Sequence, residues 1–305
     1  MRKVFGLGET VFDIIFKNGQ PISATPGGST FNSMISLGRA GVEGAFIGET
    51  GDDLVGQQIR DFLTQNHISA QAICIHKGQK SALSLAFLDD NNDAPYQFYK
   101  DHAHDRLDFI YPPIQPDDVV LFGSYYAINP VVRDQVLPFL QYAKSRGAIL
   151  YYDVNFRASH QDEAEILLPN IRQNMQLAHI TRGSDQDFNI LYHLNSPDEI
   201  YTKEIAPYCP NFICTCAAQP SQVRTQSGVM LQYPVPVIKT VSTIGAGDSF
   251  NAGFIYGILK SGIKGGDFIK GLKSDLWDVP LSFAQQFAAN ACQSLDNCID
   301  RDFVR

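Results

Sequence analysis

Short apolar runs recur along the chain, separated by segments in which apolar residues return at helical spacing. The short runs lie at residues 4–7, 119–122, 148–152, 178–181 and 211–216. Helical spacing marks residues 131–146 and, near the end of the chain, residues 283–295. Strands that alternate with helices in this way predict an α/β protein with a doubly wound, mostly parallel sheet flanked by helices.

Residues 82–88 alternate, with Leu83, Leu85 and Phe87 on one side. The polar run 89–93 follows, and residues 96–99 then resume the alternation. This pattern predicts a β-hairpin, whose aromatic face could pack on the core. No internal repeat or low-complexity linker is visible, so we expect a single domain over residues 1–305.

Residues 243–259 join a glycine-containing turn to a helical pattern. Residues 245–248 are Gly-Ala-Gly-Asp, and glycine allows turns and close approaches that other side chains forbid. From Phe250 to Leu259 the apolar residues return at helical spacing. Because the first amides of a helix point outward and its dipole favours negative charge, this junction predicts an anion-binding site.

Asp248 stands at the start of that helix and has two interpretations. It is either the cap of the helix or a general base beside a bound phosphate, and the spacing does not decide between them. Two commoner glycine motifs are excluded. No lysine follows Gly247, as a Walker loop requires, and Phe250 stands where a dinucleotide fingerprint needs a third glycine.

Other polar residues stand where a ligand or a local cap would explain them. Asp13 lies within the apolar run 11–16, where an aspartate needs a hydrogen-bonding partner; ligand hydroxyls or a turn would supply one. Asn32 falls in the first turn of a helix that opens after a Gly-Gly turn, as a cap or a ligand contact. Asn155 and Arg157 follow the strand at 148–152, and doubly wound sheets bind ligands at such strand ends.

Composition narrows the class of partner. The chain is 44% hydrophobic and 18% charged, as in ordinary globular proteins with a core, and its net charge of −8 argues against nucleic-acid or anionic-membrane surfaces.

None of the six cysteines forms a zinc-type pattern, and Cys214 and Cys216 alternate along a strand as buried small residues would. With no signal-peptide pattern and no apolar run of membrane-spanning length, we expect a cytoplasmic protein.

The glycine junction resembles the second signature of the PfkB, or ribokinase-like, carbohydrate kinases, Asp-Thr-x-Gly-Ala-Gly-Asp-x-Phe. Every signature residue matches except the first, which is Ser242 here. In that family the residue matching Asp248 deprotonates a sugar hydroxyl, and the amides matching Gly245, Ala246 and Gly247 hold the transferring phosphate. The resemblance implies a ribokinase-like fold and a kinase that uses ATP and Mg²⁺.

Weaker matches extend the resemblance over nearly the whole chain. Residues 26–38 and 48–56 are similar to the family's first signature region, which implies that Asp13, Gly28 and Asn32 bind sugar hydroxyls.

The Asp-x-Asn-x-Arg element resembles one that lies beside the substrate and phosphate in the family, which implies substrate binding by Asn155 and Arg157. Asn290 matches the asparagine of a helix that lines the adenine site.

Two nucleotide-side segments depart from the family pattern. Ser184 and Asp187 stand where the family has Asn-x-x-Glu, a nucleotide and Mg²⁺ element, and a helix cap formed by the same two residues is the structural alternative. Thr215 begins the run 215–220, in which both glycines of the family's Thr-x-Gly-x-x-Gly loop are replaced. Side chains therefore stand where backbone normally approaches the nucleotide.

The sequence therefore predicts an ATP-dependent kinase of a small sugar, with fructose or a related sugar favoured. A sugar-binding protein that transfers phosphate poorly, acting as a sensor or scaffold, is the alternative that the altered nucleotide loop favours. A nucleoside kinase of the same fold is a second alternative. The resemblance also implies a small β lid from segments near residues 14–26 and 82–100, which often mediates dimerisation.

Overall fold

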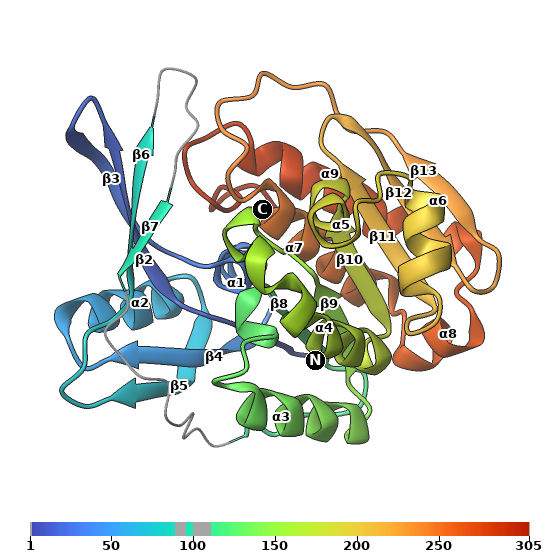
Figure 1. Cartoon of the computed structure of the whole chain (residues 1–305), viewed down its shortest axis with the longest axis horizontal. Helices are drawn as coiled ribbons and strands as arrows, with labels where there is room; N and C mark the ends of the chain where they lie inside the picture. Colours follow the sequence, from blue (N-terminus) through green and yellow to red (C-terminus); the bar gives the residue numbers. More distant parts are fainter. Residues whose placement is uncertain (1, 89–95, 100–110, 305) are drawn as a thin grey trace.

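A nine-stranded sheet forms the centre of the molecule (Figure 1) in the computed structural model, which describes residues 2–88, 96–99 and 111–304. Its strands, in spatial order, are β13 (Met230–Tyr233), β12 (Gln219–Thr225), β11 (Asn211–Cys216), β10 (Ile180–Ser184), β9 (Ile149–Asp153), β8 (Val119–Gly123), β1 (Val4–Leu7), β4 (Gly44–Gly51) and β5 (Ile68–His76). Neighbours from β11 to β5 pair in parallel, whereas β12 and β13 are antiparallel additions at one edge. The predicted doubly wound, mostly parallel sheet is confirmed.

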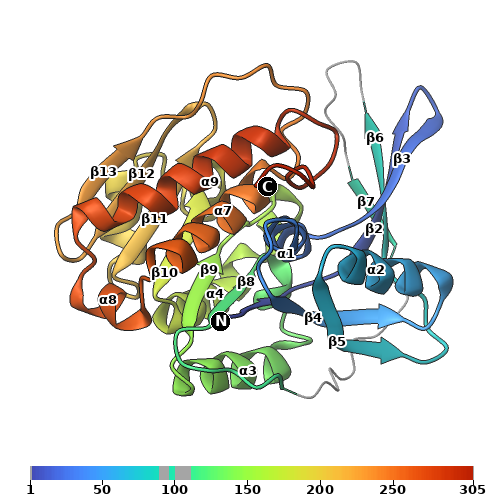
Figure 2. The same cartoon turned by 180° about the vertical axis from the view of Figure 1, so that it is seen from behind.

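Helices cover both faces of this sheet. One face carries α3 (Arg133–Ser145), α4 (Ala164–Leu177), α5 (Asp185–Tyr192) and α6 (Pro197–Ile200). The other face, seen in Figure 2, carries α1 (Ser29–Arg39), α2 (Leu54–Gln65), α7 (Ala246–Ser261), α8 (Gly265–Lys270) and α9 (Asp278–Ala291).

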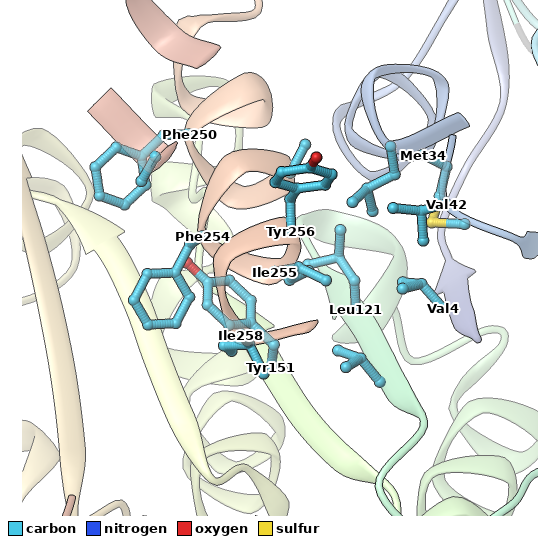
Figure 3. Packing of buried hydrophobic residues seen from close by; sticks show 14 of the residues in the cluster. Val4, Met34, Val42, Leu121, Tyr151, Phe250, Phe254, Ile255, Tyr256 and Ile258 are labelled. Atoms are coloured by element: carbon cyan, nitrogen blue, oxygen red, sulfur yellow. The ribbon is translucent and has the colours of Figure 1, made fainter. Parts of the chain in front are cut away.

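The strands are apolar on both sides because both sides are buried. In β9, Ile149 and Tyr151 join one hydrophobic cluster while Leu150 and Tyr152 join the other. Figure 3 shows Phe254 and Ile258 of α7 beside Tyr151, with Met34 of α1 and Val4 of β1 in the same cluster. This packing fixes the starts of α1 and α7 next to each other, beyond the carboxyl ends of the strands.

A second sheet stands beside α1 (Figures 1 and 2). It has four strands, in the order β3 (Gln20–Gly27), β2 (Val11–Lys17), β6 (Leu83–Leu88) and β7 (Tyr96–Tyr99). The pairing of β6 with β7 is antiparallel, so the predicted hairpin is confirmed, while the polar run 89–93 lies outside the described residues. The two segments assigned to a lid thus belong to one small sheet.

The terminal helix differs from its prediction. We expected residues 283–295, whereas α9 runs from Asp278 to Ala291. It begins earlier because Pro280 lies in its first turn, where a proline is tolerated. The predicted helix over 131–146 is confirmed as α3. Within the part of the chain that is described, no helix has both the length and the apolar character needed to cross a membrane.

Candidate active site

The turn at residues 243–248 forms the start of α7. Gly245 is the N-cap, with φ of 77°, and a Cβ added there would lie 2.2 Å from the Asn297 carbonyl oxygen, so only glycine fits. The interpretation of Asp248 as the helix cap is therefore wrong, because Asp248 lies inside the first turn. The Ala246 amide donates to the Thr243 carbonyl oxygen at 3.2 Å. The next amides, of Gly247 and Asp248, face the helix N-terminus without an intrahelical acceptor.

The Asp248 carboxylate is held by α1. Ser29 Oγ donates to Oδ1 at 2.7 Å, and Asn32 Nδ2 donates to Oδ2 at 2.9 Å. Ser33 Oγ donates to the Asp248 carbonyl oxygen at 2.9 Å, which ties the two helices together at the same point. Asn32 is thus a partner of the predicted base, and Ser29 is a further contact that the sequence had not indicated.

Burial raises the pKa of Asp248 to about 6, although the hydrogen bonds from Asn32 and Ser29 act in the opposite direction. The negative charge of Asp153 adds to the rise and the positive charge of Arg157 opposes it, so both side chains act on Asp248 electrostatically. A carboxylate with such a pKa is ionised at neutral pH and basic enough to accept a proton, as a general base requires.

Asp13 of β2 lies on the same side of the site. It accepts a hydrogen bond from Ser84 Oγ of β6, and burial raises its pKa to about 6. The charges of Glu9 and Asp248 contribute to that rise. A Cβ added to Gly27 would lie 2.2 Å from Asp13 Oδ2 and 3.9 Å from Asn32 Oδ1. The predicted sugar-binding residues therefore come together where β2, β3 and α1 meet, and Gly28 is the N-cap of α1.

A buried cation, Arg182 of β10, lies under the glycine turn. Its Nη1 donates to Asp153 Oδ1 at 3.0 Å, and its Nη2 donates to Thr215 Oγ1 at 2.7 Å. A Cβ added to Gly247 would lie 3.1 Å from Nη2, which places the guanidinium directly against the turn. Asn251 Nδ2 of α7 donates to the other Asp153 oxygen at 2.7 Å. This network joins β9, β10, β11 and α7 behind the anion turn.

Sequence reasoning missed Arg182. Arg182 follows a short apolar run, and that run predicted only a strand. A charged side chain at the end of a buried strand needs a partner, and this requirement alone could have identified Arg182 from the sequence. Asn155 and Arg157, which were predicted, lie just beyond β9. Asn155 is buried with φ of 36°, and Arg157 is exposed and close enough to lower the pKa of Asp248.

The Ser184 and Asp187 side chains form the capping box of α5. Ser184 Oγ accepts from the Asp187 amide at 3.1 Å, and Asp187 Oδ2 accepts from the Ser184 amide at 2.6 Å. Burial raises the pKa of Asp187 and the charge of Arg182 opposes the rise. The structural alternative is therefore present, and the predicted contacts to nucleotide and metal remain predictions.

The described residues contain no cluster of three or more His, Cys, Asp or Glu side chains that could bind a metal ion. Mg²⁺ keeps several waters and is commonly held by one or two carboxylates together with substrate phosphates. Asp187 is buried, and its Oδ2 oxygen is engaged in the helix cap.

The predicted nucleotide loop is a tight hairpin between β11 and β12. Cys216 pairs with Gln219 across it, and Ala217, at the first lost glycine position, adopts φ of 47°. The backbone thus keeps a left-handed conformation that normally favours glycine.

Ser242, the other departure from the family pattern, accepts a hydrogen bond from the Ile244 amide at 3.2 Å within its own turn. Asn290 exchanges hydrogen bonds with Asp300.

The start of α7, with its outward-facing amides, thus meets a carboxylate of raised pKa beside further carboxylate and amide side chains, an arrangement suited to a phosphotransferase. The pfkB family of carbohydrate kinases matches residues 1–294, and the chain belongs to that family. It is therefore a carbohydrate kinase, an enzyme that transfers a phosphoryl group to a sugar hydroxyl. The resemblance seen in the sequence is confirmed.

Relatives in this family include several fructokinases. The chain is 29% identical over 234 residues to fructokinase-2 of Solanum lycopersicum, which covers 74% of this chain and 70% of the relative. It is 23% identical over 285 residues to a fructokinase of Klebsiella pneumoniae, which covers 90% of this chain and 89% of the relative.

Solved structures confirm the ribokinase-like fold. A fructokinase of Vibrio cholerae O395, in a form with fructose, ADP and calcium ion bound, has a TM-score of 0.82 at 20% identity and covers 99% of this chain and 98% of its own. An aminoimidazole riboside kinase of Salmonella enterica, complexed with aminoimidazole riboside and an ATP analogue, gives the same four values. At this identity the likeness concerns the fold alone.

Proposed function

We propose that the protein is an ATP-dependent kinase of fructose or a closely related sugar. The observation that carries this proposal is the position of Asp248, which stands in the first turn of α7 and accepts hydrogen bonds from Ser29 and Asn32. The fructokinase names of the relatives support a ketose acceptor, and the nucleotides bound in similar folds support ATP as the donor.

In the proposed reaction the acceptor hydroxyl lies beside Asp248, which takes its proton as the oxygen bonds to the γ-phosphorus of ATP. The bond between that phosphorus and the β–γ bridging oxygen breaks, and ADP leaves. The Gly247 and Asp248 amides would donate to the transferring oxygens, together with Gly245 and Ala246 of the turn as the family resemblance implies. Arg182 adds positive charge beneath them.

The remaining predicted residues divide between the two substrates. Asp13, Gly28 and Asn32 would bind the sugar hydroxyls, with Asn155 and Arg157 just beyond the carboxyl end of β9. On the donor side, Ser184, Thr215 and Asn290 would contact the nucleotide. Asp187 would hold Mg²⁺ through water, and the metal would neutralise phosphate charge when bound.

A sensor that binds sugar and transfers phosphate poorly remains the alternative that one observation favours. Ala217 and Pro220 carry side chains in the hairpin where the family has nucleotide-contacting glycines. Against it, Ala217 has a left-handed backbone that normally favours glycine, and Gly245 caps α7 with outward-facing amides beyond it. We therefore favour an active kinase with weaker ATP binding than its family.

The small sheet is proposed as a lid with a different task on each face. By strand register Phe98 shares the sheet face of Asp13 and Ser84, while Phe16 and Phe87 stack at 5.0 Å on the opposite face. Phe87 is 40% exposed and Phe98 is 53% exposed. An exposed aromatic face turned away from the site favours a homodimer formed through the lid.

The function is tested by ADP release with Mg-ATP and a panel of sugars and ribosides. Fructose or a related sugar is expected to support turnover, and Asp248→Asn is the inactive control. Turnover with ribosides alone would make the protein a nucleoside kinase. If calorimetry also showed sugar binding without binding of a non-hydrolysable ATP analogue, the sensor alternative would replace the kinase.

The lid proposal has its own matched pair of variants. Phe87→Glu is expected to convert a dimer to a monomer in sedimentation, whereas Phe98→Glu, on the other face, leaves the dimer intact and raises the KM for sugar. A monomeric wild-type protein would end the dimer proposal.

The cytoplasm remains the proposed compartment, supported by six cysteines that are all free.

A further inference from the structure

Two thiols lie side by side at the end of β11. The Sγ atoms of Cys214 and Cys216 are 3.9 Å apart, within hydrogen-bonding distance for sulfur. Cys214 is fully buried, whereas Cys216 is partly exposed at the hairpin. One thiol can therefore meet a small solute while its neighbour stays protected behind it.

The backbone explains how the two sulfur atoms come so close. Residues two apart in a strand point to the same face, and the pairing of β11 with β12 shifts register between these cysteines. Thr215 lies between them and faces the other way, where its Oγ1 accepts the 2.7 Å hydrogen bond from Arg182. The thiol pair and the active-site network are therefore opposite faces of one short segment.

The surroundings shift the pKa values of the two thiols in opposite directions. The hydrogen bond between the two thiols, together with the positive charge of Arg224, lowers the pKa of Cys216 against the effects of burial and of Asp185. The same bond and burial raise the pKa of Cys214. Burial also raises the pKa of Cys292. Because the thiolate is the reactive form, Cys216 is suited to attack and Cys214 to resolve.

We propose that Cys214 and Cys216 form a reversible dithiol–disulfide site that peroxide oxidises. The Cys216 sulfur attacks one peroxide oxygen, the O–O bond breaks, and the departing hydroxide takes a proton to become water, which leaves a sulfenic acid. The Cys214 sulfur then attacks the Cys216 sulfur, the S–O bond breaks, and a second water leaves. One peroxide is reduced to two waters and two thiols become one disulfide.

Closing this disulfide must move Thr215. The two Sγ atoms, now 3.9 Å apart, must approach to about 2.05 Å to form the bond. The bond therefore draws the two cysteines together and bends the chain at the residue between them, which weakens its contact with Arg182. If Thr215 contacts the nucleotide, a step that rests on the proposed function, oxidation also weakens ATP binding.

Titration of the full-length protein with hydrogen peroxide tests the site. After denaturation, the count of free thiols is expected to fall by two from six, with loss of two hydrogens from the peptide that holds both cysteines. Dithiothreitol restores the original count. Cys216→Ser prevents the loss, Cys214→Ser leaves a Cys216 sulfenic acid that a 1,3-diketone traps, and Cys292→Ser, at another partly exposed cysteine, behaves as wild type.

Two further measurements separate the disulfide from the kinase proposal. Amide exchange over residues 211–225 is expected to be faster in the oxidised protein, and the Kd of a non-hydrolysable ATP analogue about tenfold higher, as loss of one charged hydrogen bond implies. Absence of a Cys214–Cys216 disulfide, or its formation without faster exchange, overturns the proposal. Failure of the reduced protein to bind ATP would count against the kinase alone, because the thiol count and amide exchange need no nucleotide.

Discussion

Asn32 Nδ2 of α1 donates to Asp248 Oδ2 of α7 across 2.9 Å. This bond links a residue expected to hold the sugar to the residue expected to take its proton, although 216 positions separate them in the chain. An amide donor on one carboxylate oxygen and the Ser29 hydroxyl on the other fix the orientation of Asp248. A base held in this way needs little rearrangement when the substrate arrives.

Asp248→Asn is expected to lower kcat by about 10² to 10⁴ while sugar binding survives, because the amide cannot accept the hydroxyl proton. The side chain keeps an oxygen for Asn32, so the fold is retained. Steady-state kinetics and sugar calorimetry on the same preparation provide the measurement. Near-normal kcat in a folded variant would contradict the assignment of Asp248 as the base.

The raised pKa values of Asp248 and Asp13 predict how stability changes with pH. Both carboxyls ordinarily titrate near 3.8 and are raised to about 6 in the folded protein. The stability that they contribute is present at low pH and is lost as pH rises from about 4 through about 6, because over that range the folded state binds more protons than the unfolded chain. Asp13→Asn should therefore raise the Tm more at pH 7 than at pH 5. An equal change at both pH values would contradict the shift.

The pH dependence of kcat/KM is expected to fall on the acid side, near pH 6, as Asp248 becomes protonated. Arg157→Gln should move this acid limb to higher pH, because the positive charge of Arg157 lowers the pKa of Asp248. The difference should shrink in high salt, since Arg157 is exposed and its charge is screened. An acid limb that does not move would remove Arg157 from the electrostatics of the base.

Most of the fold could be predicted from the sequence because its signals are local. The strands are short apolar runs that both helical layers bury, and the start of α7 carries its own glycines. The capping box of Ser184 and Asp187 was also visible, since the two residues are three positions apart. These features depend on nearby residues, and a single sequence contains that information.

The network around Arg182 could not be predicted in the same way. Its partners Asp153 and Thr215 lie 29 and 33 positions away on neighbouring strands, and only the register of the sheet brings them together. The contacts of Ser29 with Asp248 and of Ser84 with Asp13 likewise join distant segments. Local patterns identify candidate residues, whereas partners across the fold depend on how the layers pack.

Arg182→Met is expected to lower the free energy of unfolding by about 3–5 kcal/mol, because it leaves the buried Asp153 carboxylate without its ion pair. Asp153→Asn in the same chain should restore much of that loss. Activity should stay low in the double variant, since positive charge is still missing beneath Gly247. Urea unfolding and kcat report the two effects separately, and full recovery of kcat would show that Arg182 acts only through stability.

Asp13→Ala is expected to raise the KM for sugar, lower kcat, or both, because Asp13 is proposed to accept hydrogen bonds from sugar hydroxyls. Ser84→Ala is the matched control, since it keeps the carboxylate and removes only the hydroxyl that donates to it. Its effect on KM should be smaller. If calorimetry showed unchanged sugar affinity in Asp13→Ala, the residue would serve the structure and not the substrate.

Ala217→Gly is expected to tighten ATP binding, and Ala217→Gly/Pro220→Gly to tighten it further. Ala217 holds φ of 47°, which costs a residue with a side chain roughly 1–2 kcal/mol, and glycine removes that cost along with the methyl group at a position where the family resemblance implies close approach of the nucleotide. Pro220 lacks an amide that could donate to a phosphate.

Calorimetry with a non-hydrolysable ATP analogue, Mg²⁺ and saturating sugar measures the gain in nucleotide affinity. The control is Ala218→Gly, which leaves both former glycine positions as they are. Equal affinity in all variants would mean that the nucleotide does not approach this hairpin.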